Sequence, residues 1–423
     1  MHGMRGIAHT NEPRQAEAPP GVCAAVESAH QLATRVPAVP PHTTNEQLRA
    51  IFQRDATVSA VAVVDGDRPI GLINRRTFME SYARPFAHDL WGRKSCGSFM
   101  ERNALLVDAE ISVAELARRA SAPGSRALED GFIITEQGRY LGHGSGPDLM
   151  RALSAIEANR ALQIQQSIAY ASLIQRSLLL SSDTELAAVL PDHALIWGPR
   201  DVVGGDCYWF RKTEDGLLGA VLDCTGHGVP GAFMTLIALS SLEQAFRDER
   251  SREDPGLVLS RMNVAIKSQL HQGAASSSLE EATSDDGLDG VCFSLAAGGR
   301  ELRLASAHFP VMVRDAGGKT FHLEGPRVSV GHAETSVDQA WPTKRIALCP
   351  GAMVVMASDG CADQIGGPKR TAFGRKRLCA LLEGAGGQSA PEFARRFRVE
   401  YSAWEGAQAR RDDMMMFAFR VGP

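Results

Sequence analysis

The sequence of 423 residues lacks several features that mark particular classes of protein. No window holds the roughly 18 consecutive apolar residues of a membrane-spanning helix, and the start has no apolar signal core. The eight cysteines include no C-x-x-C pair, which argues against a zinc ribbon or a redox dithiol. The net charge of −4 leaves no global basic field for nucleic acid or anionic lipid. We therefore expect a cytoplasmic protein with reduced thiols that binds neither nucleic acid nor a membrane.

The composition that is present is ordinary for a globular protein. Hydrophobic residues make up 44% and charged residues 22%, which excludes disorder throughout, collagen-like repeats and a coiled-coil rod. At roughly 150 residues per domain, the length predicts two or three domains. Residues 1–25 mix prolines with polar residues and alanine, which predicts a disordered tail. The small, polar and acidic residues of 273–289 predict a mobile loop.

Two stretches between residues 26 and 148 resemble each other in order and content. The first, Val58–Arg76, is expected to form a strand, a turn at Asp65-Gly66-Asp67, a second strand and a helix. The second, Gly131–Met150, has the same order, with its turn near Gln137-Gly138. A helical stretch precedes each of them. The pattern indicates an internal repeat of roughly 60 to 70 residues.

The repeat is similar to a pair of CBS modules (cystathionine-β-synthase-type), small α/β units that usually pack in tandem. This resemblance implies an adenine nucleotide in the cleft between the modules, where a small hydroxyl residue and a later aspartate hold the ribose. The second repeat matches with Ser145 and Asp148, whereas the first has Asn74 and Thr77 at the corresponding places. At most one nucleotide site is implied. The alternative is a dimerisation or spacer element without a ligand.

Residues 149–182 contain no helix breaker and are expected to form one long connector helix. Apolar residues recur there at steps of three and four, which predicts an apolar stripe along the helix. Arg160 and Gln163 interrupt the stripe, so a pure coiled coil is disfavoured. We interpret the stripe as a contact between two copies in a homodimer, with core for the flanking domains as the alternative. Rotation or melting of this helix would transmit a signal.

Aspartates lie next to apolar strand patterns at four places within residues 183–423. Folding would bring such aspartates to one edge of a sheet. Hard cations such as Mg²⁺ and Mn²⁺ prefer oxygen ligands, so converging carboxylates without histidine partners indicate this class and not zinc. Each place alone is weak evidence, because Asp-Gly turns are common at strand ends. The four segments are Pro199–Phe210, Leu218–Met234, Met353–Gln364 and Arg410–Val421.

Taken in order, these segments resemble the metal-dependent protein phosphatase (PPM) family, in the bacterial branch typified by the stage II sporulation E phosphatase. The matching motifs are P-R-D-V-V-G-G-D, D-C-T-G-H-G-V-P-G-A-F-M, A-S-D-G-C-A-D-Q-I-G-G and R-D-D-M. The resemblance implies an α-β-β-α sandwich, with helices flanking two antiparallel sheets. The expected fold class is therefore a multidomain α/β (α+β) protein. Its expected parts are the tail at 1–25, the CBS pair at 26–148, the connector at 149–182 and the phosphatase domain at 183–423.

The same resemblance implies a centre of two or more Mn²⁺ or Mg²⁺ ions at one end of the sheets. Asp223 would bridge two ions and Asp206 would bind one of them, so these two are the implied catalytic residues. Asp413 is the alternative to Asp412 within its pair. Two such ions activate a water molecule for in-line attack on a phosphoryl group, and no phosphoenzyme is required. The implied ligands are Asp206, Asp223, the backbone carbonyl of Cys224, Asp359 and Asp412.

Three further positions bear on the chemistry. His227 is a candidate proton donor to the leaving oxygen, with a structural role in its glycine turn as the alternative. Arg200 is a candidate phosphate contact, with a structural pairing as the alternative. The segment Ser306–Pro310 departs from the glycine-alanine-asparagine turn that is frequent in the family, which implies a different recognition surface.

The resemblance implies a serine/threonine phosphatase acting on a small regulatory protein, such as a STAS-type anti-sigma-factor antagonist. The CBS pair would regulate this activity through the connector helix. The alternative is a catalytically silent scaffold that sequesters the regulator. Retention of all four carboxylate positions argues against that alternative.

Overall fold

The computed structural model of the chain describes residues 26–272 and 285–422, so the predicted tail and most of the predicted acidic loop lie outside the described residues. The chain divides into two compact units, Met1–Ile164 and Gln165–Pro423. This division falls inside the segment expected to be the connector helix. In the described part of the chain, no helix is both long and apolar enough to cross a membrane.

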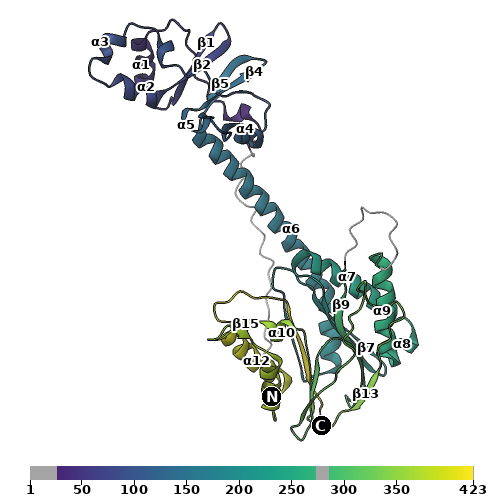
Figure 1. Cartoon of the computed structure of the whole chain (residues 1–423). Coiled ribbons are helices and arrows are strands. Elements are labelled where there is room, and N and C mark those ends of the chain that lie inside the picture. Colours follow the sequence, from purple (N-terminus) through teal and green to yellow (C-terminus); the bar gives the residue numbers. More distant parts are fainter. Residues whose placement is uncertain (1–25, 273–284, 423) are drawn as a thin grey trace, which may run out of the picture. The chain divides into compact units, whose positions relative to one another are not determined.

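The first unit contains the predicted repeat, a hairpin of two strands followed by a helix, twice over (Figure 1). In both hairpins two residues connect the strands, Gly66-Asp67 and Gln137-Gly138. Gln137 and Gly138 have φ angles of +49° and +80°, the left-handed backbone that such tight turns require. The first repeat comprises α1 (Asn45–Arg54), β1 (Ala60–Asp65), β2 (Arg68–Asn74) and α2 (Arg75–Tyr82), and the second comprises α4 (Val113–Ala120), β4 (Phe132–Glu136), β5 (Arg139–Gly144) and the start of α6.

Short elements complete this unit, and each repeat has its own apolar core. A third small cluster joins the two hairpins, because Ala62 and Leu72 of the first repeat pack with Ile133 of the second. The two repeats therefore form one folded body. The remaining elements are η1 (Ala29–Leu32), α3 (Ala87–Trp91), η2 (Cys96–Phe99), β3 (Leu106–Asp108), which pairs in parallel with β4, and α5 (Ala127–Asp130).

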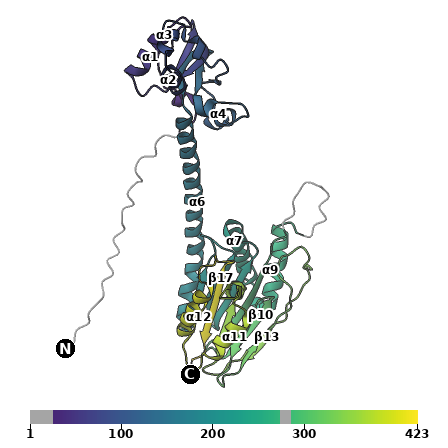
Figure 2. The same ribbon diagram turned by 60° about the vertical axis from the view of Figure 1, so that its left-hand side comes forward.

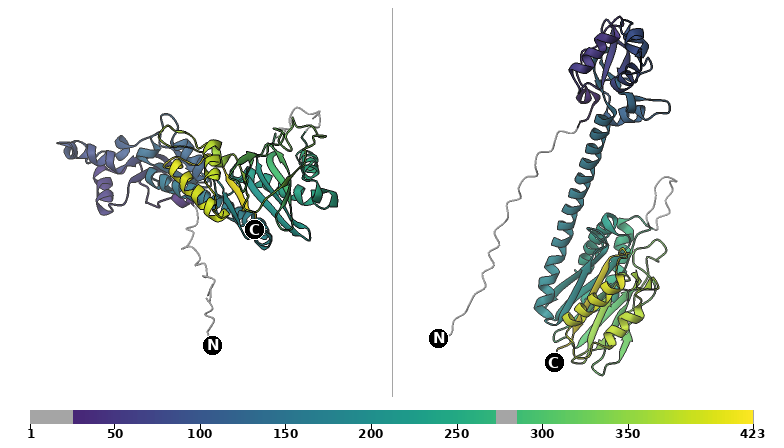
Figure 3. Two further views of the ribbon diagram at one scale, coloured as in Figure 1. Left: turned by 90° about the horizontal axis from the view of Figure 1, so that it is seen from below. Right: turned by 90° about the vertical axis from the view of Figure 1, so that its left-hand side faces the viewer.

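One uninterrupted helix, α6 (Gly146–Val189), runs from the first unit into the second (Figure 3). It starts three residues before the predicted connector and ends seven residues beyond it. No glycine or proline occurs between Asp148 and Leu190, and Pro191 follows directly, which explains both the length and the end of the helix. The sequence pattern identified the helix correctly but underestimated its extent.

The second unit is a sandwich of two antiparallel five-stranded sheets covered by helices on both outer faces (Figure 2). Helices α7 (Gly228–Ala245) and α9 (Pro255–Gln269) pack on the first sheet, and α11 (Arg375–Glu383) and α12 (Ala390–Glu405) pack on the second. The α-β-β-α prediction is confirmed. The first sheet has the order β13 (Lys344–Ala347), β10 (Glu301–Ala307), β9 (Leu288–Ala296), β8 (Gly216–Cys224), β7 (Asp206–Thr213); the second has β12 (Thr320–His322), β11 (Val311–Arg314), β14 (Met353–Ala357), β17 (Met414–Arg420), β6 (His193–Gly198).

Aromatic side chains fill the space between the two sheets. Phe417 of β17 lies with its ring centroid 4.8 Å from that of Phe210 in β7 and 5.9 Å from that of Phe293 in β9. All three are at most 2% exposed. Such rings bury large apolar areas and fix the separation of the sheets, so the strand ends that carry the aspartates hold a fixed spacing. The smaller elements are α8 (Glu249–Glu253), α10 (Gly360–Asp363), β15 (Ile365–Gly366) and β16 (Thr371–Ala372).

Candidate active site

Strand register brings the predicted aspartates to one end of the sandwich. Asp206 at the start of β7 is paired directly with Asp223 near the end of β8. Asp359 lies two residues after β14 and Asp412 two residues before β17, and these strands are antiparallel neighbours. The strand ends that carry these aspartates therefore lie together. Residues more than 200 positions apart in the sequence come close in space.

The electrostatics of these side chains show that they are close. Burial raises the pKa of Asp223 well above its usual range. Four further negative charges act in the same direction, those of Asp206, Asp359, Asp412 and Asp289. Within the described ranges, none of these carboxylates has an ion pair with a lysine or arginine. The negative charge at this end of the sheets therefore has no lysine or arginine counterion in the described part of the chain.

Asp206 is the most enclosed of the group, with 1% of its surface exposed. Its Oδ2 accepts a hydrogen bond of 2.9 Å from the hydroxyl of Ser358, whereas its Oδ1 is buried without a hydrogen-bond partner among the described residues. Burial raises the pKa of Asp206, and the neighbouring charge of Asp413 adds to this. An unpartnered buried carboxylate oxygen fits a site that binds a cation.

The adjacent aspartates of the R-D-D-M motif have different surroundings. Asp413 is buried, and its two oxygens accept from the backbone N–H groups of Arg200 (2.5 Å) and Gly205 (2.6 Å). Asp412 is exposed, and the one hydrogen bond to its side chain from the described residues is that of the Asp413 backbone N–H to Oδ1, at 2.9 Å. Asp413 thus holds the loop at 200–205 in place, and Asp412 keeps oxygens available for a ligand.

Glycines in the motifs allow two backbone segments of the site to lie very close to each other. A Cβ atom on Gly205 would lie 2.5 Å from the carbonyl oxygen of Gly226 and 2.6 Å from that of Cys224. No side chain fits at that distance. Gly205 therefore permits the loop before Asp206 to lie against the carbonyl of Cys224, one of the implied ligands.

His227 and Arg200, the two other candidates for a role in the chemistry, make contacts that hold neighbouring segments of the chain together. The ring Nδ1 of His227 is 2.9 Å from Oδ2 of Asp201, and both side chains are about half exposed. Arg200 donates from its guanidinium to the carbonyl of Arg411 at 3.2 Å, which is a structural pairing. Cys224 is buried, and a hydrogen bond with Cys207 together with burial raises the pKa of its thiol, which disfavours a thiolate nucleophile.

Asp289 is a member of the cluster that sequence reasoning missed. It is register-paired with Asp223 across β8 and β9. The prediction of a mobile loop over 273–289 is wrong for Leu288 and Asp289, because both belong to β9. Alternating apolar residues after position 288 were the available signal, but the acidic residues before it concealed the strand start.

The donor set consists of oxygen atoms alone, which suits Mg²⁺ or Mn²⁺. Across 26–272 and 285–422, no three His, Cys, Asp or Glu side chains already surround a common point as ligands. Binding therefore requires small movements of the carboxylates, or water and backbone carbonyls to complete the ligand shell. Two observations show that these residues fit a hard cation. The buried Oδ1 of Asp206 has no hydrogen-bond partner, and the negative charge of the aspartates has no lysine or arginine counterion, both among the described residues.

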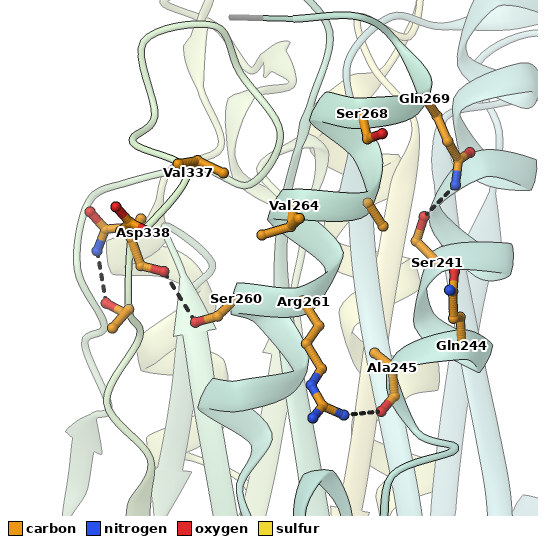
Figure 4. A pocket seen from close by; sticks show the side chains of 13 residues that line it. Ser241, Gln244, Ala245, Ser260, Arg261, Val264, Ser268, Gln269, Val337 and Asp338 are labelled. Atoms are coloured by element: carbon orange, nitrogen blue, oxygen red, sulfur yellow. Dashed lines mark hydrogen bonds between the residues drawn. The ribbon is translucent and has the colours of Figure 1, made fainter.

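A cavity of about 750 Å³ lies elsewhere in the second unit, between α7, α9 and the loop at residues 337–340 (Figure 4). Ser260 and Arg261 of α9 and Ser241 and Gln244 of α7 are among the residues that line it, and Arg261 extends toward the carbonyl of Ala245 in α7. None of the clustered aspartates is among the described residues that line it. Despite its size, this cavity is therefore not the candidate active site.

In the first unit, Ser145 and Asp148 bind each other at the start of α6. The Ser145 hydroxyl donates to Asp148 Oδ2 at 2.5 Å and accepts from the Asp148 backbone N–H at 3.2 Å, which caps the helix. Asn74 caps α2 in the same way by accepting from the N–H groups of Arg76 and Thr77. A cleft of about 470 Å³ between the repeats is lined by Asn74 and Ser145, and Asp148 is not among its described lining residues.

Comparison with known proteins agrees with these features. The family model for stage II sporulation protein E (SpoIIE) matches residues 213–422, and that for the CBS domain matches residues 29–84. The SiaA-PP2C domain of Pseudomonas aeruginosa is 34% identical, with a TM-score of 0.55, over 62% of this chain and 99% of that one. A search of curated proteins found no match.

Two further solved structures match this chain at lower similarity. The PP2C phosphatase domain of SpoIIE from Bacillus subtilis, with a fragment of its regulatory domain, is 18% identical, with a TM-score of 0.40, over 55% of this chain and 63% of that one. The catalytic domain of the serine/threonine phosphatase PstP, solved with two manganese ions, is 14% identical, with a TM-score of 0.39, over 55% of this chain and 98% of that one.

The site and the matches define a PP2C-type (PPM) serine/threonine phosphatase. This chain belongs to that family, in its SpoIIE-type branch, and it carries an N-terminal CBS domain. The predicted resemblance to this family is confirmed. The roles of individual residues rest on the geometry described above.

Replacing Gly205 by alanine is expected to lower the turnover of p-nitrophenyl phosphate at least tenfold, because the added Cβ pushes the loop away from the Cys224 carbonyl. Steady-state hydrolysis with Mn²⁺ measures this effect. Gly422→Ala is the matched control, since a Cβ there meets no atom within 4 Å. Unchanged turnover in a Gly205→Ala protein would show that the close approach is not needed.

Proposed function

We propose that this protein is a Mg²⁺- or Mn²⁺-dependent phosphatase that hydrolyses phosphoserine or phosphothreonine on a small regulatory protein. The observation that carries the proposal is the convergence of Asp206, Asp223, Asp359 and Asp412 on one end of the sandwich without a basic partner among the described residues. When bound, two divalent ions supply an activated water molecule and neutralise the phosphoryl oxygens.

Each aspartate has a distinct task in this proposal. Asp223 lies between the others, paired with Asp206 on one side and Asp289 on the other, which suits a ligand shared by two ions. Ser358 orients Asp206 through its hydroxyl, and Asp413 fixes the loop that leads to Asp206. The Cys224 carbonyl, Asp359 and Asp412 complete the proposed ligand set.

The substrate class rests on the family. SpoIIE-type phosphatases resemble this chain over residues 213–422, and the family resemblance implies a STAS-type anti-sigma-factor antagonist or a related small protein. The open, exposed positions of Asp359 and Asp412 support a substrate that approaches from solvent as part of a protein surface. A free small metabolite would be expected to require a more enclosed site.

Replacing Asp223 by asparagine is expected to lower p-nitrophenyl phosphate turnover with Mn²⁺ at least 100-fold, because the carboxylate that would hold the ions loses its charge. Chelation by EDTA should abolish the activity of the unaltered protein, and added Mn²⁺ or Mg²⁺ should restore it. Asp338→Asn, on the α7/α9 cavity, serves as the control and should retain full activity. Equal rates in the Asp223→Asn and unaltered proteins would refute the proposed metal centre and favour a silent scaffold.

Regulation by the CBS pair is part of the proposal, and α6 provides the physical link to the site. Gln175 of α6 is buried, and its amide donates to the carbonyl of Gly204 at 2.7 Å and accepts the Gly204 N–H at 3.3 Å. The same amide donates to Thr235 of α7 at 3.2 Å. A rotation of α6 would therefore move the loop that precedes Asp206.

We expect an adenine nucleotide to bind the cleft of the first unit and to change the phosphatase rate. Calorimetry with ATP, ADP and AMP should detect binding that Ser145→Ala removes and Gln175→Ala retains. The rate response should be lost in both variants, because Gln175 acts downstream of binding. Ser112→Ala is the matched control, since Ser112 caps α4 with the same 3.2 Å geometry but does not line the cleft. Absence of heat with all three nucleotides would favour a spacer without a ligand.

A homodimer through α6 is the last part of the proposal. Tyr170, Leu173 and Ile174 are 66%, 62% and 45% exposed on α6, and Phe233 of α7 is 63% exposed. Large apolar side chains at this exposure favour burial against a second copy. Light scattering should give a dimer for the full chain and a monomer for Leu173→Glu. The control Gln166→Glu, on the same helix, should remain dimeric. A monomeric unaltered protein would exclude this contact.

A further inference from the structure

A small basic cleft lies beside the aspartate cluster in the second unit, with a volume of about 300 Å³. Its floor is apolar, formed by Phe309, Val311 and Leu323, each at most 9% exposed. Its other lining residues include His308, His322, Glu324, Arg327 and Arg375. The aspartate cluster is acidic, so this cleft presents the opposite charge next to it.

The cleft is joined to the cluster through His308. The ring Nδ1 of His308 is 2.7 Å from Oδ2 of Asp289, which is register-paired with Asp223. The Ser329 hydroxyl donates to Oδ1 of the same aspartate at 2.5 Å. The cleft therefore begins one side chain away from the proposed metal ligands.

The backbone also holds His308 at this place. Its φ angle is +54°, a left-handed conformation that non-glycine residues seldom adopt. Its N–H donates to the carbonyl of Pro326 at 3.0 Å, which brings the neighbouring Arg327 to the cleft. Such conformations persist where the surrounding contacts impose them, and they concentrate at functional sites. This is the segment Ser306–Pro310, whose sequence departs from the family turn.

The two arginines of the cleft have no carboxylate partner in the parts of the chain that the structure describes. Glu324 is the one carboxylate among the described lining residues, so the two guanidinium groups leave an excess of one positive charge over it. Lys344 is a further cation next to a lining residue, because its Nζ donates to the backbone carbonyl of Glu324 at 2.5 Å. Guanidinium groups present paired donors that match carboxylates, and two unpaired ones in a cleft favour an anionic ligand.

We propose that this cleft binds an acidic side chain of the phosphoprotein substrate, close to its phosphorylated residue, through Arg327 and Arg375. The inference rests on the proposed function and adds a specificity determinant to it. The phosphoryl group lies at the aspartate cluster, and a neighbouring aspartate or glutamate of the substrate enters the basic cleft. A substrate with neutral flanking residues would form no ion pair with this cleft and would bind no more tightly because of it.

The test compares two phosphoserine peptides that differ only in flanking residues, glutamates in one and glutamines in the other, with p-nitrophenyl phosphate as the substrate without flanks. The unaltered full chain should hydrolyse the acidic peptide with a kcat/KM about tenfold higher than the neutral one. The double variant Arg327→Ala/Arg375→Ala should lose this preference while its p-nitrophenyl phosphate turnover stays unchanged. The charge reversal Arg327→Glu/Arg375→Glu should prefer a peptide with lysine flanks. Arg395→Ala/Arg398→Ala, on exposed positions of α12, is the matched control for the loss of two charges.

A binding measurement separates recognition from catalysis. Fluorescence anisotropy of the unphosphorylated acidic peptide, in EDTA, should show binding that salt weakens and that Arg327→Ala/Arg375→Ala removes. Equal kcat/KM for the two peptides in the unaltered protein would overturn the inference, even with p-nitrophenyl phosphate hydrolysed normally. A parallel loss of p-nitrophenyl phosphate turnover in the arginine variant would also overturn it, because the arginines would then contact the transferred phosphoryl group. Absence of all hydrolysis in the unaltered protein would instead contradict the proposed function, and the anisotropy would still decide the inference.

Discussion

Mutual repulsion among carboxylates at one end of the sandwich is the constraint on which the rest of the structure depends. Asp206 is buried, Asp223 lies half-buried beside it, and the charges of Asp359 and Asp412 are nearby. Placing such charges together costs free energy unless a cation compensates them. The apolar packing of the two sheets, centred on Phe417, holds the strand ends at a fixed spacing against that repulsion. The fold thus maintains an arrangement that the site alone would not adopt.

Neutral hydrogen bonds orient the carboxylates without cancelling their charge. The hydroxyl of Ser358 contacts Asp206, and backbone N–H groups of the 200–205 loop are bound by Asp413. Gln175 attaches the same loop to α6. A loop that is held from both sides, by the terminal strand and by the long helix, can respond to a change in either one. This connection places the proposed regulation and the proposed chemistry in the same few residues.

The charge distribution around the site is divided between two neighbouring surfaces. The aspartate cluster attracts cations, whereas Arg327 and Arg375 in the adjoining cleft attract anions. His308 lies between them and is bound to Asp289. An anionic phosphoprotein would bind both surfaces at once, because metal ions bound by the aspartate cluster would give that end of the sandwich a positive charge. The net charge of the whole chain conceals this local separation.

The sequence by itself determined the hairpin turns, the long helix and the four motif aspartates. Glycine and proline positions restrict the backbone locally, and strand-end aspartates are visible as short patterns. Only the tertiary structure decided which residues meet. It placed Asp289 opposite Asp223, gave Asp413 a structural partner while leaving Asp412 exposed, and joined Ser145 to Asp148 in a helix cap. It also assembled the cleft of Arg327 and Arg375 from separate segments. These outcomes depend on strand register and on packing between distant segments, and neither is encoded in the spacing of neighbouring residues.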